Sequence, residues 1–330
     1  MDAVLVLVVA LPIILLGAEF FTNAIEHVGM AFGVSEGVTG SLLAAVGTAL
    51  PETAIPVLAS WRHGGGAHVA VGAVLGAPLM LSTLTMAVMG LACASGRGLR
   101  SELAPEQSGA RRDLGTFVAV FLLAFAGLFL PPGGSRLVLA AILVAAYGFY
   151  VRATVKASAG LVAGGHRTST RARLHLARSR LRHLAGLRYI QLLLGLGVIL
   201  AGAQLFISGI ESLGALLKVS VLTLALVIVP IATELPEKVN SVLWIRRRQD
   251  TLALGNVTGA MVFQGSLLPA LGLTLTPWRP APLLVAVMLT TLAAAVFVRM
   301  RLGAKRGLRV YHMLALGLLY VAVLGYLLTS

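Results

Sequence analysis

Two short stretches of the chain decide its fold: Gly47-Thr48-Ala49-Leu50-Pro51-Glu52 and Ala232-Thr233-Glu234-Leu235-Pro236-Glu237. Each places a proline inside a long apolar run, where the missing N–H and the ring kink or break a helix. Each also places a carboxylate directly after that proline. A charge at the centre of a bilayer costs about 3 kcal/mol on insertion scales. Two such glutamates therefore imply that something in the membrane neutralises them.

The two stretches belong to an internal repeat. Residues 17–52 align with residues 202–237 without a gap, at a constant offset of 185. The identical positions include Glu, Pro, Ser and Gly, which rarely agree by chance in an apolar chain. They are Gly17/Gly202, Ala18/Ala203, Phe21/Phe206, Ile25/Ile210, Glu26/Glu211, Gly29/Gly214, Val34/Val219, Ser35/Ser220, Thr48/Thr233, Leu50/Leu235, Pro51/Pro236 and Glu52/Glu237. After a two-residue shift the likeness continues in residues 70–77 and 253–260.

Composition places this repeat in a membrane. Of 330 residues, 58% are hydrophobic and 12% are charged, whereas a soluble domain carries about 25% charged residues. Most of the surface must therefore face lipid. The net charge of +14 would indicate nucleic acid in a soluble protein. Here the basic residues lie between apolar runs, so membrane topology explains them and no nucleic-acid partner is expected.

The spacing of apolar runs predicts ten membrane spans, since a spanning helix needs about 20 apolar residues. The spans are 3–29, 36–61, 67–94, 114–131, 137–155, 188–216, 220–245, 251–275, 281–300 and 309–328. Of the 26 Lys and Arg residues, 21 fall in loops after the odd-numbered spans or at the span ends that border these loops, and four fall in loops after the even-numbered spans. Cytoplasmic loops carry such an excess. We therefore expect a multi-pass protein of a bacterial-type inner (plasma) membrane, with both termini outside and the basic loops in the cytoplasm.

The predicted fold is all-α, with two five-helix repeats, 1–155 and 188–330, joined by a basic cytoplasmic loop over 156–187. Because five is odd, the second repeat enters the membrane inverted. Inverted repeats place equivalent elements at one midplane interface and permit alternating access. Within the loop, Arg171, Arg178 and Arg182 share one side of a helical projection. That pattern is typical of a basic amphipathic helix on anionic lipid, and a plain cytoplasmic linker is an equal alternative.

The paired Pro-Glu motifs themselves indicate a cation site. Broken helices free backbone carbonyls, which need a partner inside a membrane. Together with hydroxyls and two carboxylates they offer the oxygen ligands that hard cations prefer. The alternative is a structural kink with a protonated, hydrogen-bonded glutamate, but two copies at an inverted-repeat interface favour the ion site. Glu19, whose repeat partner is Gln204, is predicted to line an access pathway.

Both repeats resemble the signature of the sodium/calcium exchanger family of the calcium/cation antiporter superfamily. That signature is Gly-Thr-Ser-x-Pro-Glu, followed one helix later by Gly-Asn-x-x-Gly-Ser-Asn. The resemblance implies ten helices with helices 2 and 7 broken, and exchange of Ca²⁺ or a related cation for Na⁺ or H⁺. It requires no cofactor besides the transported ions. It also implies that Glu52 and Glu237 are the central metal ligands, assisted by Thr48 and Thr233. We further predict Glu234 and Gln264 as metal ligands and Asn256 as a residue of the access pathway.

Several positions depart from the family signature. The Ser after Thr is Ala49 in one repeat and Glu234 in the other, and the Gly-Asn pair survives only as Gly255-Asn256. The other departures replace polar residues by apolar ones or by an amide: Ala73, Ala77, Ala260, Leu81 and Gln264. Fewer oxygen ligands remain for sodium, so coupling to protons is expected nearly as strongly as coupling to Na⁺.

Lys238 is a further anomaly, because its repeat equivalent is the uncharged Thr53. It stands four residues after Glu234, a spacing at which side chains on one helix meet. A Glu234–Lys238 pair would neutralise itself and leave Glu52 and Glu237 to balance one divalent cation. Two alternatives remain: Lys238 turns toward Glu237 and takes the place of a cation, or it extends away from the site.

Three classes of function follow from these residues. Cation antiport is favoured. The alternative is a degenerate, non-transporting relative that acts as a membrane scaffold or sensor, which the lost ligands and Lys238 would suit. An intramembrane enzyme is disfavoured, because the spans carry no His-Glu-x-x-His motif.

Overall fold

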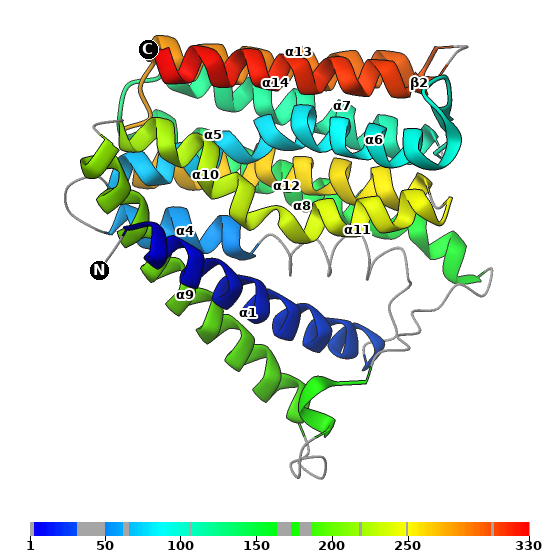
Figure 1. The fold of residues 1–330 in the computed structure, drawn as a ribbon, viewed down its shortest axis with the longest axis horizontal. Coiled ribbons are helices and arrows are strands. Elements are labelled where there is room, and N and C mark those ends of the chain that lie inside the picture. The colour runs from blue at the N-terminus through cyan, green and yellow to red at the C-terminus, as the bar shows by residue number, and fades with distance from the viewer. Residues whose placement is uncertain are drawn as a thin grey trace.

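The computed structural model describes residues 3–31, 50–61, 66–105, 107–163, 173–178, 186–217, 220–248, 250–304 and 307–329. Almost all of these residues are helical (Figure 1). The α-helices are α1 (Ala3–Ala31), α4 (Leu50–Ser60), α5 (Gly66–Met80), α6 (Met86–Arg97), α7 (Gln107–Ala126), α8 (Gly134–Ala163), α9 (Leu187–Leu217), α10 (Val221–Thr233), α11 (Leu235–Arg246), α12 (Asp250–Leu275), α13 (Pro282–Leu302) and α14 (Val310–Thr329). The shorter elements are the π-helix η2 (Leu81–Thr85), the 3₁₀ turns η3 (Gly127–Phe129) and η4 (His175–Arg178), and the strands β1 (Glu102–Leu103) and β2 (Leu308–Arg309).

Within the described residues, eight helical segments are long and apolar enough to cross a membrane, and each matches one predicted span. The two remaining predicted spans, 36–61 and 220–245, carry the Pro-Glu motifs. Span 220–245 consists of two helices, α10 and α11, and α4 is the described part of span 36–61. Each of these helices is too short to be counted alone. The all-α membrane fold is confirmed, and the count of ten spans stays a prediction.

The two Pro-Glu motifs start two equivalent half-helices. Helix α4 begins at Leu50 and α11 begins at Leu235, so both have proline second and glutamate third. Proline is tolerated there because N–H groups in a first turn have no intrahelical acceptor. The predicted break in helix 7 is confirmed at Glu234, which separates α10 from α11 with φ −92° and ψ 9°. The residues before Leu50 lie outside the described part of helix 2.

Helices α1 and α9 show the inverted symmetry directly. A Cβ atom placed on Gly17 would lie 2.8 Å from the backbone N of Ile199, and one on Gly202 would lie 3.0 Å from the backbone N of Ile14. Gly17 and Gly202 are repeat equivalents, and so are Ile14 and Ile199. Each glycine therefore admits the backbone of the opposite helix at the equivalent position. The two copies of one sequence element pack against each other about a local two-fold axis.

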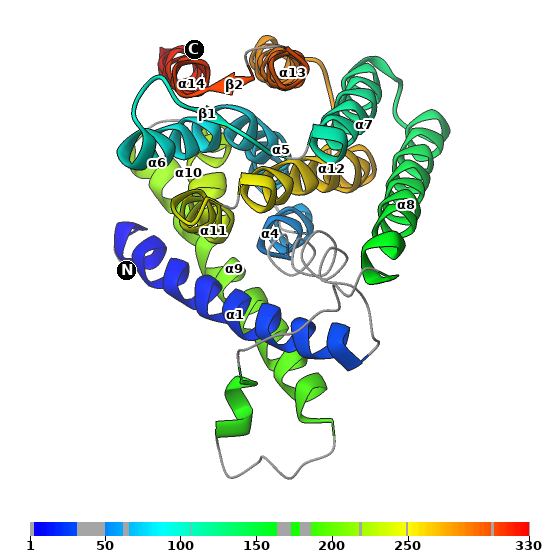
Figure 2. The same cartoon turned by 90° about the vertical axis from the view of Figure 1, so that its right-hand side faces the viewer.

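The α1–α9 pair forms its own layer. In Figures 1 and 2 the two helices lie side by side along one side of the molecule, opposite α13 and α14. A smaller apolar core joins the pair to α4, α5 and α10, whereas a larger core unites α5 to α8 with α11 to α14. The pair thus contacts the motif-bearing helices through a core that is largely separate from that of the main helix body.

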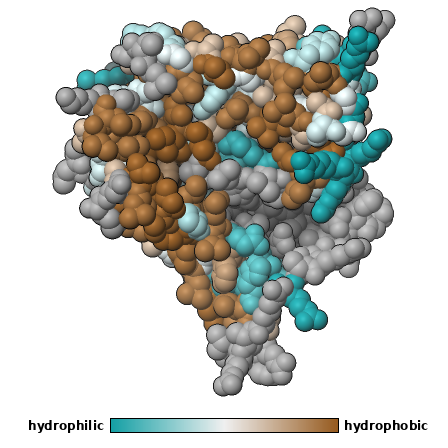
Figure 3. All heavy atoms as spheres, in the orientation of Figure 1, coloured by the Kyte–Doolittle hydropathy of each residue, from teal (hydrophilic) through white to brown (hydrophobic). Residues whose placement is uncertain are grey.

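The outer faces of the spanning helices are apolar, as a lipid boundary requires. Large exposed hydrophobic residues include Val4, Leu5 and Val8 on α1 and Leu137 and Val138 on α8. In Figure 3 apolar residues cover much of the visible face. In water so much contiguous apolar surface would be a liability, so these faces fit a bilayer.

Contacts between loops agree with the predicted charge distribution. Strand β1, in the loop after span 3, pairs antiparallel with β2, in the loop after span 9 (Figure 2). Arg97, at the end of α6, forms a bidentate pair with Asp250, at the start of α12, with both N–O distances 2.7 Å. The loops after spans 3, 7 and 9 therefore meet on one side of the molecule, as the basic residues predicted.

Two helices extend beyond the membrane spans predicted for them. Helix α7 begins at Gln107 rather than at residue 114, and α8 runs to Ala163, inside the predicted loop 156–187. The apolar pattern detects the part of a helix within the hydrocarbon layer, whereas long basic side chains let a helix continue beyond it.

Of the predicted amphipathic segment, residues 173–178 pack on the protein, where Leu174 contacts Ala24 and Leu187. Arg171, Arg182 and the side chain of Arg178 lie outside the described part, so their contact with anionic lipid stays a prediction.

The Arg97–Asp250 pair gives a prediction about pH. Burial raises the pKa of the Asp250 carboxyl, but hydrogen bonds from Arg97 and from the Ala104 N–H outweigh burial and hold the pKa below its usual range. The pair therefore stabilises the fold above the unfolded-state pKa of about 3.9, and this contribution is lost as the pH falls through the lower folded-state pKa. In thermal unfolding, Asp250→Asn should melt below the wild type by a constant margin above about pH 5, and the margin should shrink below about pH 4. A margin that is the same at every pH would contradict this role.

Candidate ion-binding site

Glu52 is the third residue of half-helix α4 and points into the protein interior. Its side chain is 1% exposed, and neither carboxylate oxygen accepts a hydrogen bond from another residue in the described part of the chain. It interacts electrostatically with Glu237, Glu234 and Lys238. A buried carboxylate normally has hydrogen-bonded or charged partners, because leaving it without them is costly. Glu52 therefore has capacity to bind a cation.

Glu237 occupies the equivalent position in α11 and is also 1% exposed. Each glutamate lies in the first turn of its half-helix, where the helix dipole favours a negative charge. The Nδ2 atom of Asn256 lies 3.4 Å from the carbonyl oxygen of Glu237 and 3.4 Å from Oγ of Ser241. Asn256 thus fastens α11 to α12 beside the site, and its predicted role on an access pathway stays a prediction.

Of the two predicted threonine ligands, one is described. Thr233 ends α10 and is buried, and its hydroxyl donates to the carbonyl of Val229 at 3.1 Å. The proton of the hydroxyl is therefore directed into the helix, which leaves oxygen lone pairs available. Thr48, its repeat equivalent, lies outside the described residues.

Of the three arrangements considered for Lys238, the structure shows the pair with Glu234. Lys238 Nζ lies 3.4 Å from Oε2 of Glu234, and Gln264 Nε2 lies 3.5 Å from the other oxygen of Glu234. Gln264 comes from α12, so the amide joins the break in helix 7 to the neighbouring span. Among the predicted site residues, the structure brings Glu234, Lys238 and Gln264 into direct contact and places Glu52 and Glu237 within electrostatic range of them.

Sequence patterns missed two residues of this cluster. Met80 accepts from Lys238 Nζ through its sulfur at 2.9 Å. Tyr320, on α14, has a buried hydroxyl without a hydrogen-bond partner among the described residues, and it interacts electrostatically with Glu234. Both lie inside apolar runs, where nothing in the sequence separates them from core residues.

The helix after Met80 is irregular. Residues 81–85 form the π-helix η2, and Ser82 and Thr83 both donate to the carbonyl of Leu79. The hydroxyl oxygen of Thr85 is buried and has no hydrogen-bond partner in the described part of the protein. Single π-turns inside α-helices are frequent at functional sites, and this one lies in the span that supplies Met80.

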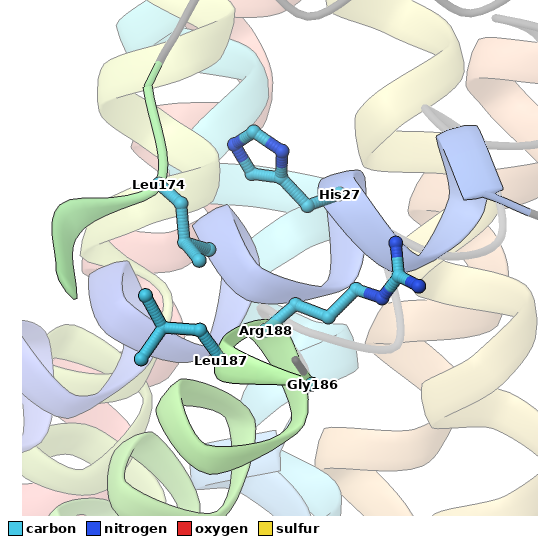
Figure 4. Close-up of a pocket in the computed structure, with 5 residues that line it drawn as sticks. All are labelled: His27, Leu174, Gly186, Leu187 and Arg188. Carbon is cyan, nitrogen blue, oxygen red and sulfur yellow. The ribbon is translucent and has the colours of Figure 1, made fainter. Parts of the chain in front are cut away.

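Glu19 is not brought to the cluster. Its side chain is 67% exposed, and its carboxylate lies 3.2 Å from Nε2 of His175. A cavity of about 270 Å³ lies near the C-terminal end of α1. It is lined by His27, Leu174, Gly186, Leu187 and Arg188 (Figure 4). It contains none of the predicted site residues. The role of Glu19 on an access pathway stays a prediction.

The cluster can attract a cation without forming a closed metal cage. In the described residues no group of three or more His, Cys, Asp and Glu side chains converges to hold a metal ion. Two buried carboxylates at the starts of two half-helices, with hydroxyl and carbonyl oxygens nearby, suit hard cations. An incomplete coordination shell suits a transported ion, because such an ion is bound and released in each transport cycle.

Comparison with known proteins gives consistent matches along the chain. The family model described as "Sodium/calcium exchanger protein" matches residues 3–156 and 187–329. The inner membrane protein YrbG of Escherichia coli is 25% identical over 287 residues, which cover 85% of this chain and 82% of YrbG. The crystal structure of the H⁺/Ca²⁺ exchanger CAX superposes with a TM-score of 0.75 at 17% identity, covering 100% of this chain and 85% of CAX. A structure of the sodium-calcium exchanger NCX_Mj gives 0.63 at 19% identity and covers 98% of both chains. At these identities the two structures establish a shared fold.

Proposed function

Because the chain belongs to the sodium/calcium exchanger protein family, we propose that it is a secondary antiporter that exchanges Ca²⁺, or a related divalent cation, for Na⁺ or H⁺. This is the family that the two Pro-Glu motifs predicted. It makes the protein a multi-pass membrane transporter rather than an enzyme. We place it in an inner (plasma) membrane with both termini outside, because the basic residues gather in the loops after the odd-numbered spans.

The buried Glu52 carboxylate is the single observation that carries this proposal. Its two oxygens accept no hydrogen bond from another described residue, and it repels Glu237 and Glu234 electrostatically. Lys238 is in contact with Glu234. One divalent cation between Glu52 and Glu237 would remove the repulsion and balance both charges.

Alternating access would use the two layers of the fold. The α1–α9 pair contacts α4, α5 and α10 through the smaller apolar core, and α4 carries Glu52. Movement of the pair against these helices would expose the site to one side of the membrane and then to the other. The symmetric glycine contacts of Gly17 and Gly202 keep the two helices together as one body.

The choice between Na⁺ and H⁺ depends on the oxygen ligands that remain. Gln264 is engaged with Glu234, and Ala73, Ala77 and Ala260 contribute no side-chain oxygen. A sodium ion needs several oxygens, whereas a proton needs one carboxylate. We therefore give H⁺ coupling about the same weight as Na⁺ coupling, and both kinds of exchanger share this fold.

Uptake of ⁴⁵Ca²⁺ into proteoliposomes tests the proposal. Purified protein is reconstituted, and uptake is compared with an outward Na⁺ gradient, with an outward H⁺ gradient, and with neither. The proposal requires uptake above that of protein-free vesicles with at least one gradient. The coupling ion is identified by the ionophore, for Na⁺ or for H⁺, that abolishes this gradient-driven ⁴⁵Ca²⁺ uptake. A folded protein with no uptake under any gradient would instead favour the scaffold or sensor.

A further inference from the structure

Lys238 lies beside the C-terminal end of α10, where the carbonyl of Pro230 accepts both the Glu234 N–H, at 3.1 Å, and the Lys238 ammonium. Its Nζ atom lies 3.3 Å from the carbonyl oxygen of Pro230, 3.4 Å from Oε2 of Glu234 and 2.9 Å from the sulfur of Met80. The residue is 9% exposed. Pro230 is in the last turn of α10, so its carbonyl group is part of the negative end of the dipole of this half-helix. The ammonium thus lies among a carboxylate, a main-chain carbonyl and a thioether.

These neighbours are acceptors suited to a small cation as well as to an ammonium. In broken transporter helices, unwound carbonyls and the C-terminal ends of half-helices coordinate Na⁺ or H⁺. Glu234 contributes a buried carboxyl group, which accepts from the amide of Gln264 at 3.5 Å and interacts electrostatically with Tyr320. The first repeat has neither charge, since its equivalent residues are Ala49 and Thr53.

We propose that the Lys238 ammonium is a built-in cation that permanently fills a monovalent-cation position formed by Glu234 and the carbonyl of Pro230. This inference rests on the proposed antiport function and specifies how many ions the site can hold. The described cluster contains three carboxylates, Glu52, Glu234 and Glu237, and one ammonium. Its net charge of −2 equals the charge of one divalent cation or of two monovalent cations.

The consequence is a site that binds one divalent cation and no additional sodium. While Ca²⁺ is bound by Glu52 and Glu237, Glu234 is already neutralised by Lys238, so no charge remains to attract Na⁺. Removal of the ammonium leaves Glu234 buried without a counter-charge. A buried carboxylate in that state is strongly destabilising, and Na⁺ is available to replace the ammonium.

Binding of ²²Na⁺ to purified protein in saturating Ca²⁺ tests this inference. Lys238→Thr supplies the residue of the first repeat and an oxygen ligand, and Lys238→Met removes the charge at similar length. The wild type should bind no saturable ²²Na⁺, whereas both variants should bind about one Na⁺ per chain. Adding Glu234→Gln to either variant should abolish the gained binding. Lys156→Met, which removes an exposed lysine in the C-terminal part of α8, should behave as the wild type.

Three results would overturn the inference. They are saturable Na⁺ binding by the Ca²⁺-loaded wild type, absence of Na⁺ binding by the folded variants, and Na⁺ binding that survives Glu234→Gln. If the variants unfold in choline chloride, the inference requires Na⁺ to restore their folding. Failure to fold in either salt would show that Lys238 acts as a structural ion pair only. ⁴⁵Ca²⁺ binding measured on the same wild-type sample separates the two proposals, because its absence contradicts the antiport function itself.

Discussion

Glu52→Gln is expected to reduce ⁴⁵Ca²⁺ exchange in proteoliposomes by about 30-fold to several thousand-fold, because removing one partner of a buried charge interaction costs about 2–5 kcal/mol. Glutamine keeps the shape of the side chain and removes only its charge. The remaining described charges, Glu234, Glu237 and Lys238, then sum to −1, too little to balance a divalent cation. Apo stability should not fall, because the variant removes a buried carboxylate whose oxygens accept no hydrogen bond from another described residue.

The matched control is Glu19→Gln, which makes the same chemical change on an exposed side chain. It should leave the exchange rate within about fivefold of the wild-type rate, since an exposed pair such as Glu19–His175 is worth about 0–1 kcal/mol at most. If Glu52→Gln is folded and exchanges as the wild type does, Glu52 is not a ligand of the transported ion. If Glu19→Gln is the variant that loses exchange, the access-pathway prediction for Glu19 gains support instead.

The second large effect, on melting temperature and exchange rate, is expected for Gly72→Ala. It depends on the packing of α5 against α10. A Cβ atom on Gly72 would lie 2.5 Å from Cβ of Ala225 and 2.9 Å from the backbone N of Leu226. Alanine is favoured over glycine in a helix by about 1 kcal/mol, but overpacking costs about 1–3 kcal/mol. The clash involves backbone, which cannot rotate away, so we expect overpacking to win. The variant should melt at a lower temperature and exchange more slowly, because α10 leads into the break at Glu234.

The repeat offers a matched control at Gly255, which aligns with Gly72. Among the described residues, no atom outside the local backbone of its own helix lies within 4 Å of a Cβ placed on Gly255, so Gly255→Ala should gain helix propensity without a clash. Its melting temperature should equal or exceed that of the wild type. Equal effects of the two substitutions would show that the close approach of α5 and α10 does not position the site.

The repeat made much of this architecture predictable. Identical spacing around Pro51 and Pro236 predicted that the two motifs have equivalent places in their helices, and Pro-Glu lies in the first described turn of both α4 and α11. The spacing of Glu234 and Lys238 predicted a pair because four residues make one helical turn. These signals are local or symmetric, so they survive in a single sequence.

Other features depend on packing between distant segments and leave no local signal. Met80 contacts Lys238, and Tyr320 interacts electrostatically with Glu234, from helices far away in the sequence. Asp113 was placed outside span 114–131, but α7 begins earlier, and the buried Asp113 carboxylate accepts from the Thr258 hydroxyl at 3.0 Å. Hydropathy treats such polar residues as span ends, whereas a partner on a neighbouring helix lets them lie inside the bundle.

Equilibrium binding of ⁴⁵Ca²⁺ to the purified protein tests the central claim most directly, namely that Glu52 and Glu237 jointly bind one divalent cation. The wild type should bind one Ca²⁺ per chain. Glu52→Gln and Glu237→Gln should each weaken binding by about 30-fold or more, and the double variant should be little worse than either single variant, because residues that share one ligand are not additive. Wild-type affinity in either folded single variant, or two independent Ca²⁺ ions per chain, would contradict the claim.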